Sequence, residues 1–259
     1  MFMDIDIQYE LPEGFDIQIF SFIDSTNMEA ARKIELGSKG GLWIKADEQS
    51  NGRGRGDRLW ISKPGNLYAS LIYEINENIR DAAQLSFITA LAVRDTIVKC
   101  IPNKNIKCKW PNDILVSGKK ISGILLESRL NKTEGINYII IGTGINVDHH
   151  PELTSYEATH INEQTKQKRS HSEVFVMLAE KMEYWLSVWK EKGFDPIRES
   201  WLGSAIGIGE KITVKTMSNQ LIGWFVGLDR DGALMLEVDG NIKIIHSGDV
   251  FLETKEREL

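Results

Sequence analysis

A glycine- and arginine-rich segment is the part of the chain whose residue types most directly suggest chemistry. It reads Gln49-Ser50-Asn51-Gly52-Arg53-Gly54-Arg55-Gly56-Asp57-Arg58-Leu59-Trp60, and three arginines and three glycines share seven of its positions. Glycines let backbone N–H groups approach an anion closely, and guanidinium groups fit phosphate and carboxylate oxygens. The same composition is typical of a flexible solvated loop or of an RNA-binding arginine-glycine segment. The predicted flanking strands and the terminal Trp60 favour an anion-binding loop.

This segment differs from the common phosphate-binding fingerprints. The chain contains no Walker sequence of the form G-x-x-x-x-G-K-S/T. Gly142-Thr143-Gly144 follows an apolar run, but neither a third glycine nor a helical pattern completes a dinucleotide-binding motif after it. This glycine pair taken alone is therefore weak evidence for a nucleotide site.

A second group of chemically suggestive residues begins with Lys109-Trp110-Pro111-Asn112-Asp113 and continues as KKISGILLE over residues 119–127. Ser117-Gly118 between them predicts a hairpin turn, which would put a carboxylate and a lysine on adjoining strands. Asp113 is a candidate for holding Mg²⁺ with its phosphates, and Lys120 for meeting a substrate carboxylate or an α-phosphate.

The direction of the side chains in this second hairpin strand follows from the two-residue period of β-structure. Alternation places Lys120, Ser122 and Ile124 on one face and Gly123 on the other. The simpler alternative is a hairpin whose lysines are only solvated, and the residues alone leave that alternative open.

A third group, Asp24-Ser25-Thr26-Asn27, lies where a predicted strand meets a predicted helix. Thr26 and Glu29 have the spacing of a capping box, so a helix N-cap is expected there. The hydroxyl, amide and free helical N–H groups at such a junction can also bind polar atoms of a ligand.

Predicted strands and helices alternate along the first four fifths of the chain and must position these groups. Hydrophobic periodicity predicts strands at 15–23, 42–46, 67–75, 106–110, 114–116, 120–127 and 138–145, and helices at 26–37, 81–100, 173–189 and 196–202. Two polar stretches, 47–65 and 149–171, are predicted to be long loops. We expect the first to be mobile when empty and ordered over a bound adenylate, and the second to close on the nucleotide.

From about residue 207 the sequence pattern changes to short predicted strands separated by turns. We therefore expect two domains, at 1–205 and 206–259. Short strands are predicted at 211–216, 221–228, 233–238 and 242–246, and such spacing favours a small β-barrel. Asp229–Gly232 reads DRDG but lacks the acidic ladder of an EF-hand, so we interpret it as a hairpin turn.

Composition excludes several classes of function. The net charge of −6 argues against a general nucleic-acid binder, which needs a basic face. Cys100 and Cys108 form no C-x-x-C pair and are expected to be reduced, buried thiols. The five histidines are scattered apart from the pair His149–His150, which argues against a structural metal. With no signal peptide and no apolar run of about 18 residues, a cytoplasmic protein that does not span a membrane is expected.

Five segments together resemble the biotin protein ligase family, in their order and in their spacing. They are DSTN at 24–27, EQSNGRGRGDRLW at 48–60, KWPND at 109–113, KKISGILLE at 119–127 and GTGIN at 142–146. The resemblance extends over roughly residues 15–250, and the combination of the glycine-arginine loop with KWPND is its most specific part. It implies an α+β fold, a mixed and largely antiparallel sheet flanked by helices, related to class II synthetase and lipoate ligase domains and followed by a small SH3-like β-barrel.

The resemblance also implies an ATP-dependent reaction in two halves. The carboxylate of biotin attacks the α-phosphate of MgATP and gives biotinyl-AMP and pyrophosphate. A lysine of the biotin carboxyl carrier protein of acetyl-CoA carboxylase, or of a related biotin-dependent carboxylase, then displaces AMP. No enzyme nucleophile is needed, and no convincing Ser-His or Cys-His arrangement is apparent.

By this resemblance, residues of all five segments take part in the site. Lys120, Arg55 and Asp113 would be catalytic, with Asp113 holding Mg²⁺ or aiding proton transfer. Biotin would be bound by Ser25, Thr26, Asn27, Gln49, Gly52, Arg53, Gly54, Arg55, Lys120 and Gly123. ATP or the adenylate would be bound by Arg53, Arg55, Arg58, Trp60, Asn112, Lys120 and Asn146.

The chain departs from the family at one position of the site. Asp57 stands where the loop often has glycine, which bears on the phosphate side of the site. About 14 residues precede the first predicted strand, so an N-terminal operator-binding domain, and with it repressor activity, is not expected. Relatives occur as monomers and as dimers, some paired through sheet edges, so a homodimer is possible.

A lipoate ligase of the same fold is the nearest alternative, but its arginine-rich, triple-glycine signature is missing. The other alternative is a non-catalytic binding protein that uses the small barrel to dock on a partner or to bind RNA. Retention of both Lys120 and Asp113 beside the glycine-arginine loop argues against a binder.

Overall fold

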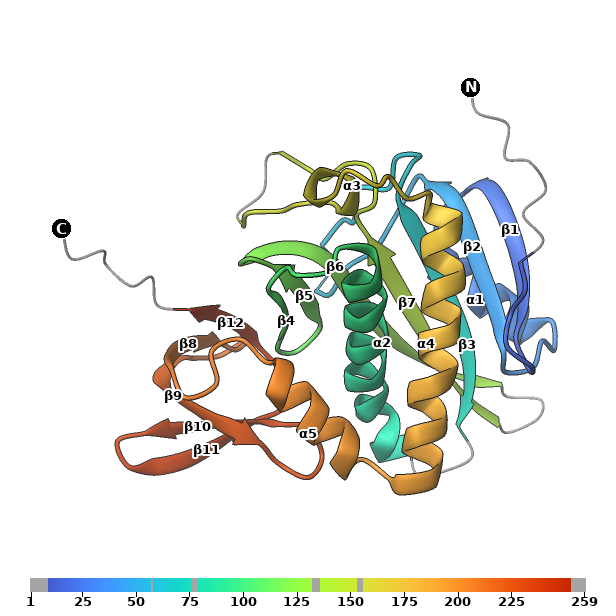
Figure 1. The fold of residues 1–259 in the computed structure, drawn as a ribbon. Coiled ribbons are helices and arrows are strands. Elements are labelled where there is room, and N and C mark those ends of the chain that lie inside the picture. Colours follow the sequence, from blue (N-terminus) through green and yellow to red (C-terminus); the bar gives the residue numbers. More distant parts are fainter. Residues whose placement is uncertain (1–8, 57, 76–78, 132–135, 153–155, 253–259) are drawn as a thin grey trace.

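A seven-stranded sheet forms the centre of the larger part of the molecule (Figure 1). The computed structural model describes residues 9–56, 58–75, 79–131, 136–152 and 156–252, so the departure at position 57 lies outside the described residues. The strands are β1 (Asp16–Ile23), β2 (Leu42–Gln49), β3 (Leu67–Ile75), β4 (Ile106–Lys109), β5 (Asp113–Val116), β6 (Lys119–Asn131) and β7 (Ile136–Ile145), in the order β1-β2-β3-β7-β6-β5-β4. Only β1 and β2 pair in parallel among them. The mixed, largely antiparallel sheet expected from the sequence is confirmed.

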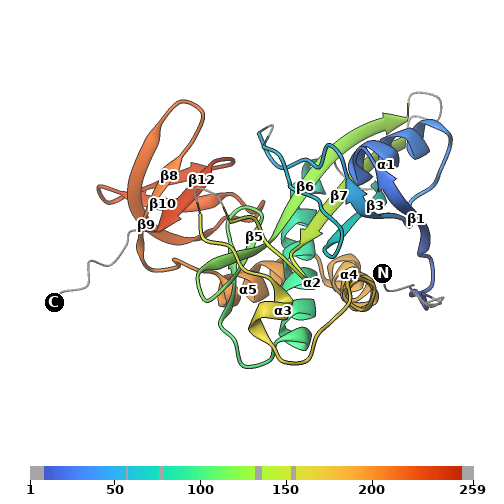
Figure 2. The same ribbon diagram turned by 90° about the horizontal axis from the view of Figure 1, so that it is seen from above.

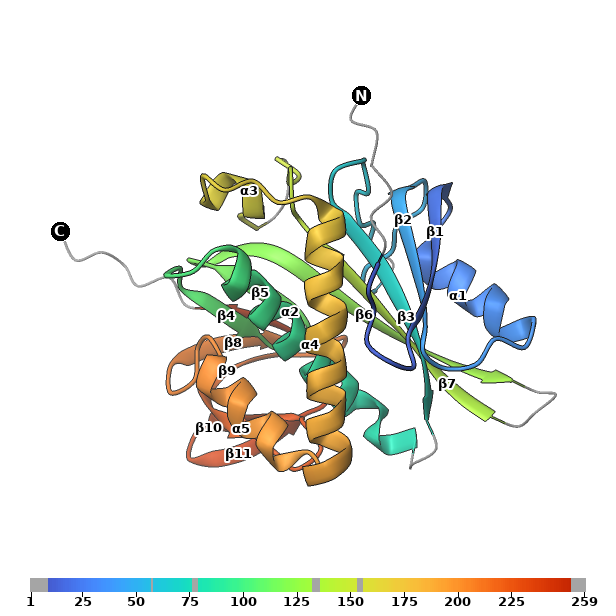
Figure 3. The same ribbon diagram turned by 45° about the vertical axis from the view of Figure 1, so that its right-hand side comes forward.

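Helices cover the two faces of this sheet unequally. Helix α1 (Thr26–Glu35) lies on one face, and α2 (Gln84–Cys100) and α4 (His171–Lys192) lie on the other, as Figure 2 shows. A 3-10 turn, η1 (Ile79–Ala83), precedes α2, so the predicted helix at 81–100 is two elements. Figure 3 shows α2 and α4 side by side across the sheet. Since α1 has only ten residues, it leaves part of its face of the sheet uncovered.

Each face of the sheet has its own apolar core. The smaller cluster joins Ala30 and Ile34 of α1 to Ile72 and Tyr138 of the strands beneath it. The larger cluster lies between the sheet, α2 and α4, and continues through α5 (Asp195–Ser204) into the C-terminal part. Central strands buried on both faces read as apolar runs rather than alternating patterns, which explains the sequence of β7.

The C-terminal part is a five-stranded antiparallel sheet. Its strands are β8 (Lys211–Lys215), β9 (Gln220–Leu228), β10 (Leu234–Val238), β11 (Asn241–Ile245) and β12 (Asp249–Leu252), in the order β11-β10-β9-β8-β12. The expected barrel is not found as a closed structure: closure needs β11 to pair with β12, and the described residues show no such pairing.

The two sheets share a buried contact. Trp110, 3% exposed, donates from Nε1 to the backbone oxygen of Gly232 at 3.3 Å. Ile206 N donates to Cys108 O at 2.9 Å, just after α5 ends. A tryptophan from the KWPND segment therefore anchors the C-terminal sheet beside the larger one.

Several predicted boundaries differ from the structure. Strand β2 continues to Gln49 and β6 to Asn131, because pairing with neighbouring strands extends them beyond their apolar residues. The predicted loop at 149–171 contains a short helix, α3 (Ile161–Gln164). Cys100 and Cys108 are free and buried as expected, and burial raises their thiol pKa values to about 11 and 12. None of the helices in the described ranges is long and apolar enough to cross a membrane.

Candidate active site

A cavity opens on the α1 side of the large sheet, next to the start of α1. All the residues predicted for the site line this cavity except Gly52 and Asn146. Its lining is Ser25, Thr26, Asn27, Gln49, Arg53, Gly54, Arg55, Arg58, Leu59, Trp60, Tyr68, Asn112, Asp113, Lys120, Gly123, Ile124, Leu125, Gly142, Thr143, Gly144 and Tyr156. Three groups of residues that are far apart in the sequence thus meet at one place.

Glycines form the floor of the cavity because larger residues would not fit. Gly123 and Gly144 pair across β6 and β7, and the ring of Trp60 lies over both. A Cβ atom would lie 2.5 Å from the Trp60 ring at Gly144 and 3.0 Å from it at Gly123. At Gly142 it would lie 2.3 Å from Asn27 Oδ1. The Gly-Thr-Gly sequence is therefore required by packing at the site, although it completes no nucleotide-binding motif.

The start of α1 contributes a buried polar network. The Thr26 backbone N–H and hydroxyl both donate to Gln49 Oε1, at 2.8 and 3.2 Å. Ser70, fully buried on β3, shares its one hydroxyl hydrogen between Thr26 Oγ1 and Asn27 Oδ1, at 2.7 and 2.6 Å. The Asn27 amide in turn donates to Glu127 at 2.8 Å. These groups hold one another in place and present donors and acceptors to one end of the cavity.

The capping box predicted at Thr26 and Glu29 is wrong. Ser25 is the N-cap residue, with extended backbone and no side-chain capping bond. Glu29 instead accepts from Arg32 within the helix. The Gln49 side chain, which comes from a different strand, takes the role of the cap, and helix-local spacing has no information about such a partner.

Arg53 forms an ion pair with Glu127, which is largely buried beside the cavity. Glu127 thereby accepts from both Arg53 and Asn27 and fixes two cavity-lining side chains. The guanidinium of Arg53 is one third exposed, so it remains accessible to a bound anion.

Lys120 and Asp113 lie together at the opposite end of the cavity. Lys120 Nζ is 2.7 Å from Asp113 Oδ1, and both side chains are at least four-fifths buried. Lys120 Nζ also lies 5.6 Å from the ring centroid of Trp60 and 5.0 Å from that of Tyr156. A cation so enclosed is suited to an anionic substrate.

The prediction that Lys120 and Gly123 point to opposite faces is wrong. Ile114 pairs with Ser122 but Leu115 pairs with Lys120, so β6 has a bulge at Ile121. One extra residue reverses the alternation, and a Cβ on Gly123 would lie 3.5 Å from Lys120 Cε. The bulge is what turns Lys120 into the cavity.

Arg55 and Arg58 reach from the glycine-arginine loop to the C-terminal sheet. Arg55 donates to Asn112 Oδ1 at 3.1 Å and to Gly248 O at 3.4 to 3.5 Å. Arg58 pairs with Asp249 at 2.9 Å. Burial lowers the pKa of Arg55, and the nearby Asp249 carboxylate opposes that shift. Burial also lowers the pKa of Lys109, the first residue of KWPND.

Two predicted site residues lie outside the cavity lining. A Cβ on Gly52 would lie 2.3 Å from Ser62 Oγ and from Trp60 O, so this glycine permits the close approach of the two sides of the loop. Asn146 donates from Nδ2 to Thr159 O at 3.0 Å and is 4% exposed. Its side chain holds the segment before α3.

Sequence reasoning missed several contributors to the site. Ser70, Glu127, Gly142, Gly144 and Tyr156 were assigned no role there. Glu127 and the two glycines lie inside segments that carry the family resemblance, so those segments could have identified them as site residues. Ser70 and Tyr156 lie in none of those segments, and only the folded chain brings them to the site.

A magnesium ion is compatible with one residue of the cavity. Asp113 is the only carboxylate among the described residues that line it. Mg²⁺ is commonly held by one or two carboxylates together with substrate phosphates, so this single carboxylate fits a Mg²⁺ that arrives with a nucleotide.

Comparisons with known proteins identify the family of this chain. Residues 19–146 match the Biotin/lipoate A/B protein ligase family, and residues 207–253 match the Biotin protein ligase C terminal domain. A biotin–[acetyl-CoA-carboxylase] ligase of Paracoccus denitrificans is 35% identical over 234 residues, which cover 88% of this chain and 97% of that protein. A bifunctional ligase/repressor of Bacillus subtilis is 32% identical, over 89% of this chain and 72% of its own length.

A solved structure has the same fold over nearly the whole chain. The biotin protein ligase of Aquifex aeolicus in complex with biotin and ATP is 29% identical, with a TM-score of 0.76, covering 92% of this chain and 98% of that one. The fold and the two matched regions define a biotin or lipoate ligase. The chain belongs to the biotin protein ligase family.

Proposed function

We propose that this chain is a biotin protein ligase that makes biotinyl-AMP and pyrophosphate from biotin and MgATP and transfers biotin to a carrier lysine. The observation that carries this proposal is the single cavity in which the glycine-arginine loop, the KWPND hairpin and the start of α1 meet. The relatives' names and the Aquifex complex with biotin and ATP support the same chemistry.

The two ends of the cavity suit the two ends of biotin. The polar network of Thr26, Asn27 and Gln49 offers the donors and acceptors that a ureido group needs. The glycine floor and the Trp60 ring give an apolar passage beside it. Arg55 and Lys120 at the other end suit a carboxylate and an α-phosphate.

Catalysis then consists of positioning and electrostatic stabilisation. A biotin carboxylate oxygen bonds to the α-phosphorus, and the bond to pyrophosphate breaks. Lys120 and Arg55 stabilise the charge that develops on the phosphate oxygens. Bound with ATP, Mg²⁺ would neutralise phosphate charge, with Asp113 as its protein ligand.

The second half-reaction needs a neutral amine. The acceptor lysine loses a proton, its nitrogen bonds to the biotinyl carbonyl carbon, and AMP leaves with the bonding electrons. Asp113, 2.7 Å from Lys120, is the carboxylate placed to assist that proton transfer.

The partner we propose is a biotin carboxyl carrier protein or domain. A second cavity, between the two sheets, shares Arg55, Asn112 and Ile124 with the first and extends to Arg230 and His246, which follow strands β9 and β11 of the C-terminal part. It offers a route for a lysine to the adenylate. We place the reaction in the cytoplasm, where ATP is made and thiols such as Cys108 stay reduced. We also propose that the chain divides into two domains, at 1–205 and 206–259, and that two copies can form a homodimer.

Intact mass spectrometry tests the proposal directly. The purified protein is incubated with biotin, MgATP and a biotin carrier domain, and pyrophosphate is measured in parallel. We expect a biotinyl mass increase that requires all components and disappears when the target lysine of the carrier is replaced. The absence of both the mass increase and pyrophosphate would reject the proposal, and activity with lipoate instead of biotin would identify a lipoate ligase.

A further inference from the structure

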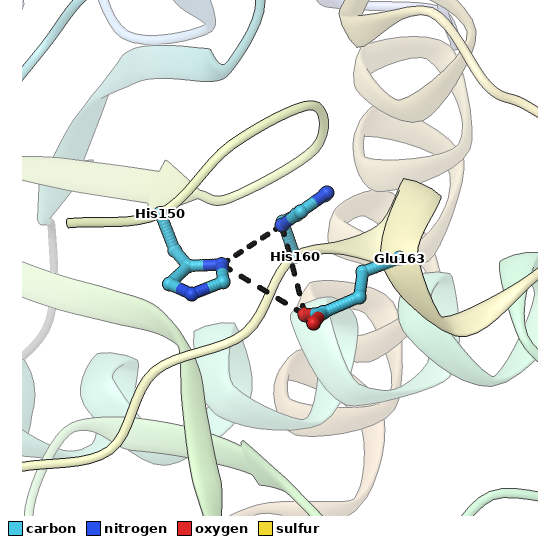
Figure 4. A group of neighbouring side chains, drawn as sticks. All are labelled: His150, His160 and Glu163. Carbon is cyan, nitrogen blue, oxygen red and sulfur yellow. Dashed lines mark hydrogen bonds and ion pairs between the residues drawn. The ribbon is translucent and has the colours of Figure 1, made fainter. Parts of the chain in front are cut away.

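Two histidines and a glutamate converge in the segment that joins β7 to α4 along the chain (Figure 4), and none of the three lines the cavity. The Nδ1 atoms of His150 and His160 are 2.8 Å apart, and each lies 3.8 Å from Glu163 Oε2. The histidine side chains are 24% and 18% exposed and the glutamate is 49% exposed. The three ligand atoms therefore face one point that is sheltered by the rings and open to solvent at the carboxylate.

These separations suit a small tetrahedral ion. Zinc takes nitrogen and oxygen ligands at about 2.0 to 2.2 Å, so ligand atoms in a tetrahedral site are roughly 3.4 Å apart. The observed values of 2.8 and 3.8 Å lie on either side of that separation. Small side-chain rotations that move the ligand atoms by a few tenths of an ångström would bring them to that separation.

The glutamate is already oriented by neighbouring groups. Thr159 Oγ1 donates to Glu163 Oε2 at 2.8 Å, and Gln164 Nε2 donates to Thr159 Oγ1 at 2.8 Å. Hydrogen-bonded carboxylates of this kind are usual around bound metals, because an outer contact fixes the ligand. The nearby charges are mixed: Asp148 favours a cation, and Lys119 and Lys168 oppose it.

We propose that His150, His160 and Glu163 bind a divalent transition-metal ion of the zinc type. Two imidazoles and one carboxylate favour such an ion over Mg²⁺ or Ca²⁺, which prefer all-oxygen ligands. Water would complete the four ligands. No local motif marks this site, because His150 and His160 are ten residues apart in the chain and meet only when it is folded.

An ion here would join His150 to His160, which follows residues 156–159, and these residues contact the active site. Lys120 N donates to Glu157 O at 2.8 Å, and Thr159 N donates to Lys120 O at 2.9 Å. Tyr156, on the same segment, lines the cavity. The metal would therefore steady the backbone that lies against Lys120 from a place outside the cavity.

The test is metal binding by the whole protein, without an affinity tag and after removal of metals by a chelator. Titration calorimetry with Zn²⁺ should give one ion per chain, and Co²⁺ should give the visible absorption of a tetrahedral site. His160→Ala and Glu163→Gln should each weaken binding at least about tenfold, since even outer-sphere changes often cost that much. Circular dichroism must show that each variant is folded.

His149→Ala is the matched control, because it removes the adjacent imidazole and leaves the three proposed ligands. Zn²⁺ should also slow amide hydrogen exchange across residues 156–163 in the parent protein and not in Glu163→Gln. Three results would each overturn the proposal: no stoichiometric binding, an equal loss in His149→Ala, or full retention in folded His160→Ala. Because the readout is binding, the outcome is independent of ligase activity.

Discussion

Lys120 is the side chain on which the proposed adenylation depends most. It is the enclosed cation of the cavity, paired with Asp113 and flanked by two aromatic rings. A preorganised charge costs no reorganisation when the transition state forms, so its loss cannot be made good by solvent.

We predict that Lys120→Ala lowers the rate of pyrophosphate release by about 100-fold or more, because one such donor stabilises a transition state by about 3 to 4 kcal/mol. The neighbouring Lys119→Ala is the control, since Lys119 is half exposed and pairs with Glu157 rather than with Asp113. A folded Lys120→Ala protein that forms the adenylate at a near-parental rate would remove this residue from the mechanism.

A second prediction concerns the glycine floor. Gly144→Ala would place a methyl group 2.5 Å from the Trp60 ring, so the ring must leave its position over β6 and β7. We expect biotin affinity, measured by calorimetry, to fall at least about tenfold, because a core overpacked by one carbon typically costs about 1 to 3 kcal/mol.

Gly203→Ala in α5 is the control for that substitution. Nothing lies within 4 Å of the added carbon there, and alanine favours a helix over glycine. This variant should bind biotin normally and be more stable by about 0.4 to 1 kcal/mol. Unchanged biotin binding by Gly144→Ala would mean that Trp60 does not form part of the biotin site.

Among the elements, α1 depends on β2 for its N-terminal hydrogen bond. The Gln49 carboxamide accepts from the Thr26 N–H and hydroxyl and also donates to Ser62 Oγ at 2.8 Å. One side chain thus joins the end of β2, the start of α1 and the far side of the glycine-arginine loop. Stability and ligand binding are coupled at this residue.

We predict that Gln49→Ala lowers the free energy of unfolding by about 0.5 to 2 kcal/mol, the usual cost of losing a helix N-cap, and weakens biotin binding. Gln49→Glu keeps an acceptor, and a negative charge at a helix N-terminus is favourable. It should recover most of the stability, measured by urea unfolding. Equal stability of Gln49→Ala and the parent would show that solvent satisfies the Thr26 N–H equally well.

For the molecule as a whole, the glycine-arginine loop connects the two sheets through Arg55 and Arg58. The Arg58–Asp249 pair has side chains that are 58% and 43% exposed, and Arg55 is 4.0 Å from the same carboxylate. Exposed ion pairs contribute about 0 to 1 kcal/mol, because solvent screens them and two side chains must be ordered. The buried contact of Trp110 with the C-terminal sheet holds the parts together more firmly.

We therefore predict that Asp249→Asn changes the KM for ATP by less than about fivefold, which corresponds to about 1 kcal/mol. A 100-fold higher KM for ATP in this variant would show that Asp249 positions Arg55 or Arg58 for the reaction. Initial rates of pyrophosphate release over a range of ATP concentrations measure this.

Local patterns in the sequence were enough to predict most of the elements and most of the lining of the site. Strands such as β1 and β3 follow from their hydrophobic pattern and bounding turns. Two of the segments that carry the resemblance supply the main cations of the site: the glycine-arginine loop supplies its arginines, and the segment that forms β6 supplies Lys120. The β6 bulge, the Gln49 cap and the open C-terminal sheet were not predictable in this way. The bulge is a shift of register between the two strands of one hairpin, which strict alternation does not show, and the other two features depend on contacts between segments further apart in the chain.

What the residues alone established is the chemistry available to this protein: three arginines on a glycine-rich loop, a lysine with an aspartate, and polar groups at a helix start. Which of them meet was decided by long-range packing. The bulge at Ile121 turns Lys120 toward the cavity, the glycines of β7 give room to Trp60 and Asn27, and the fold after β7 brings His150 to His160. Side-chain periodicity is a local property, whereas register, close approach and convergence exist only between segments that the folded chain places in contact.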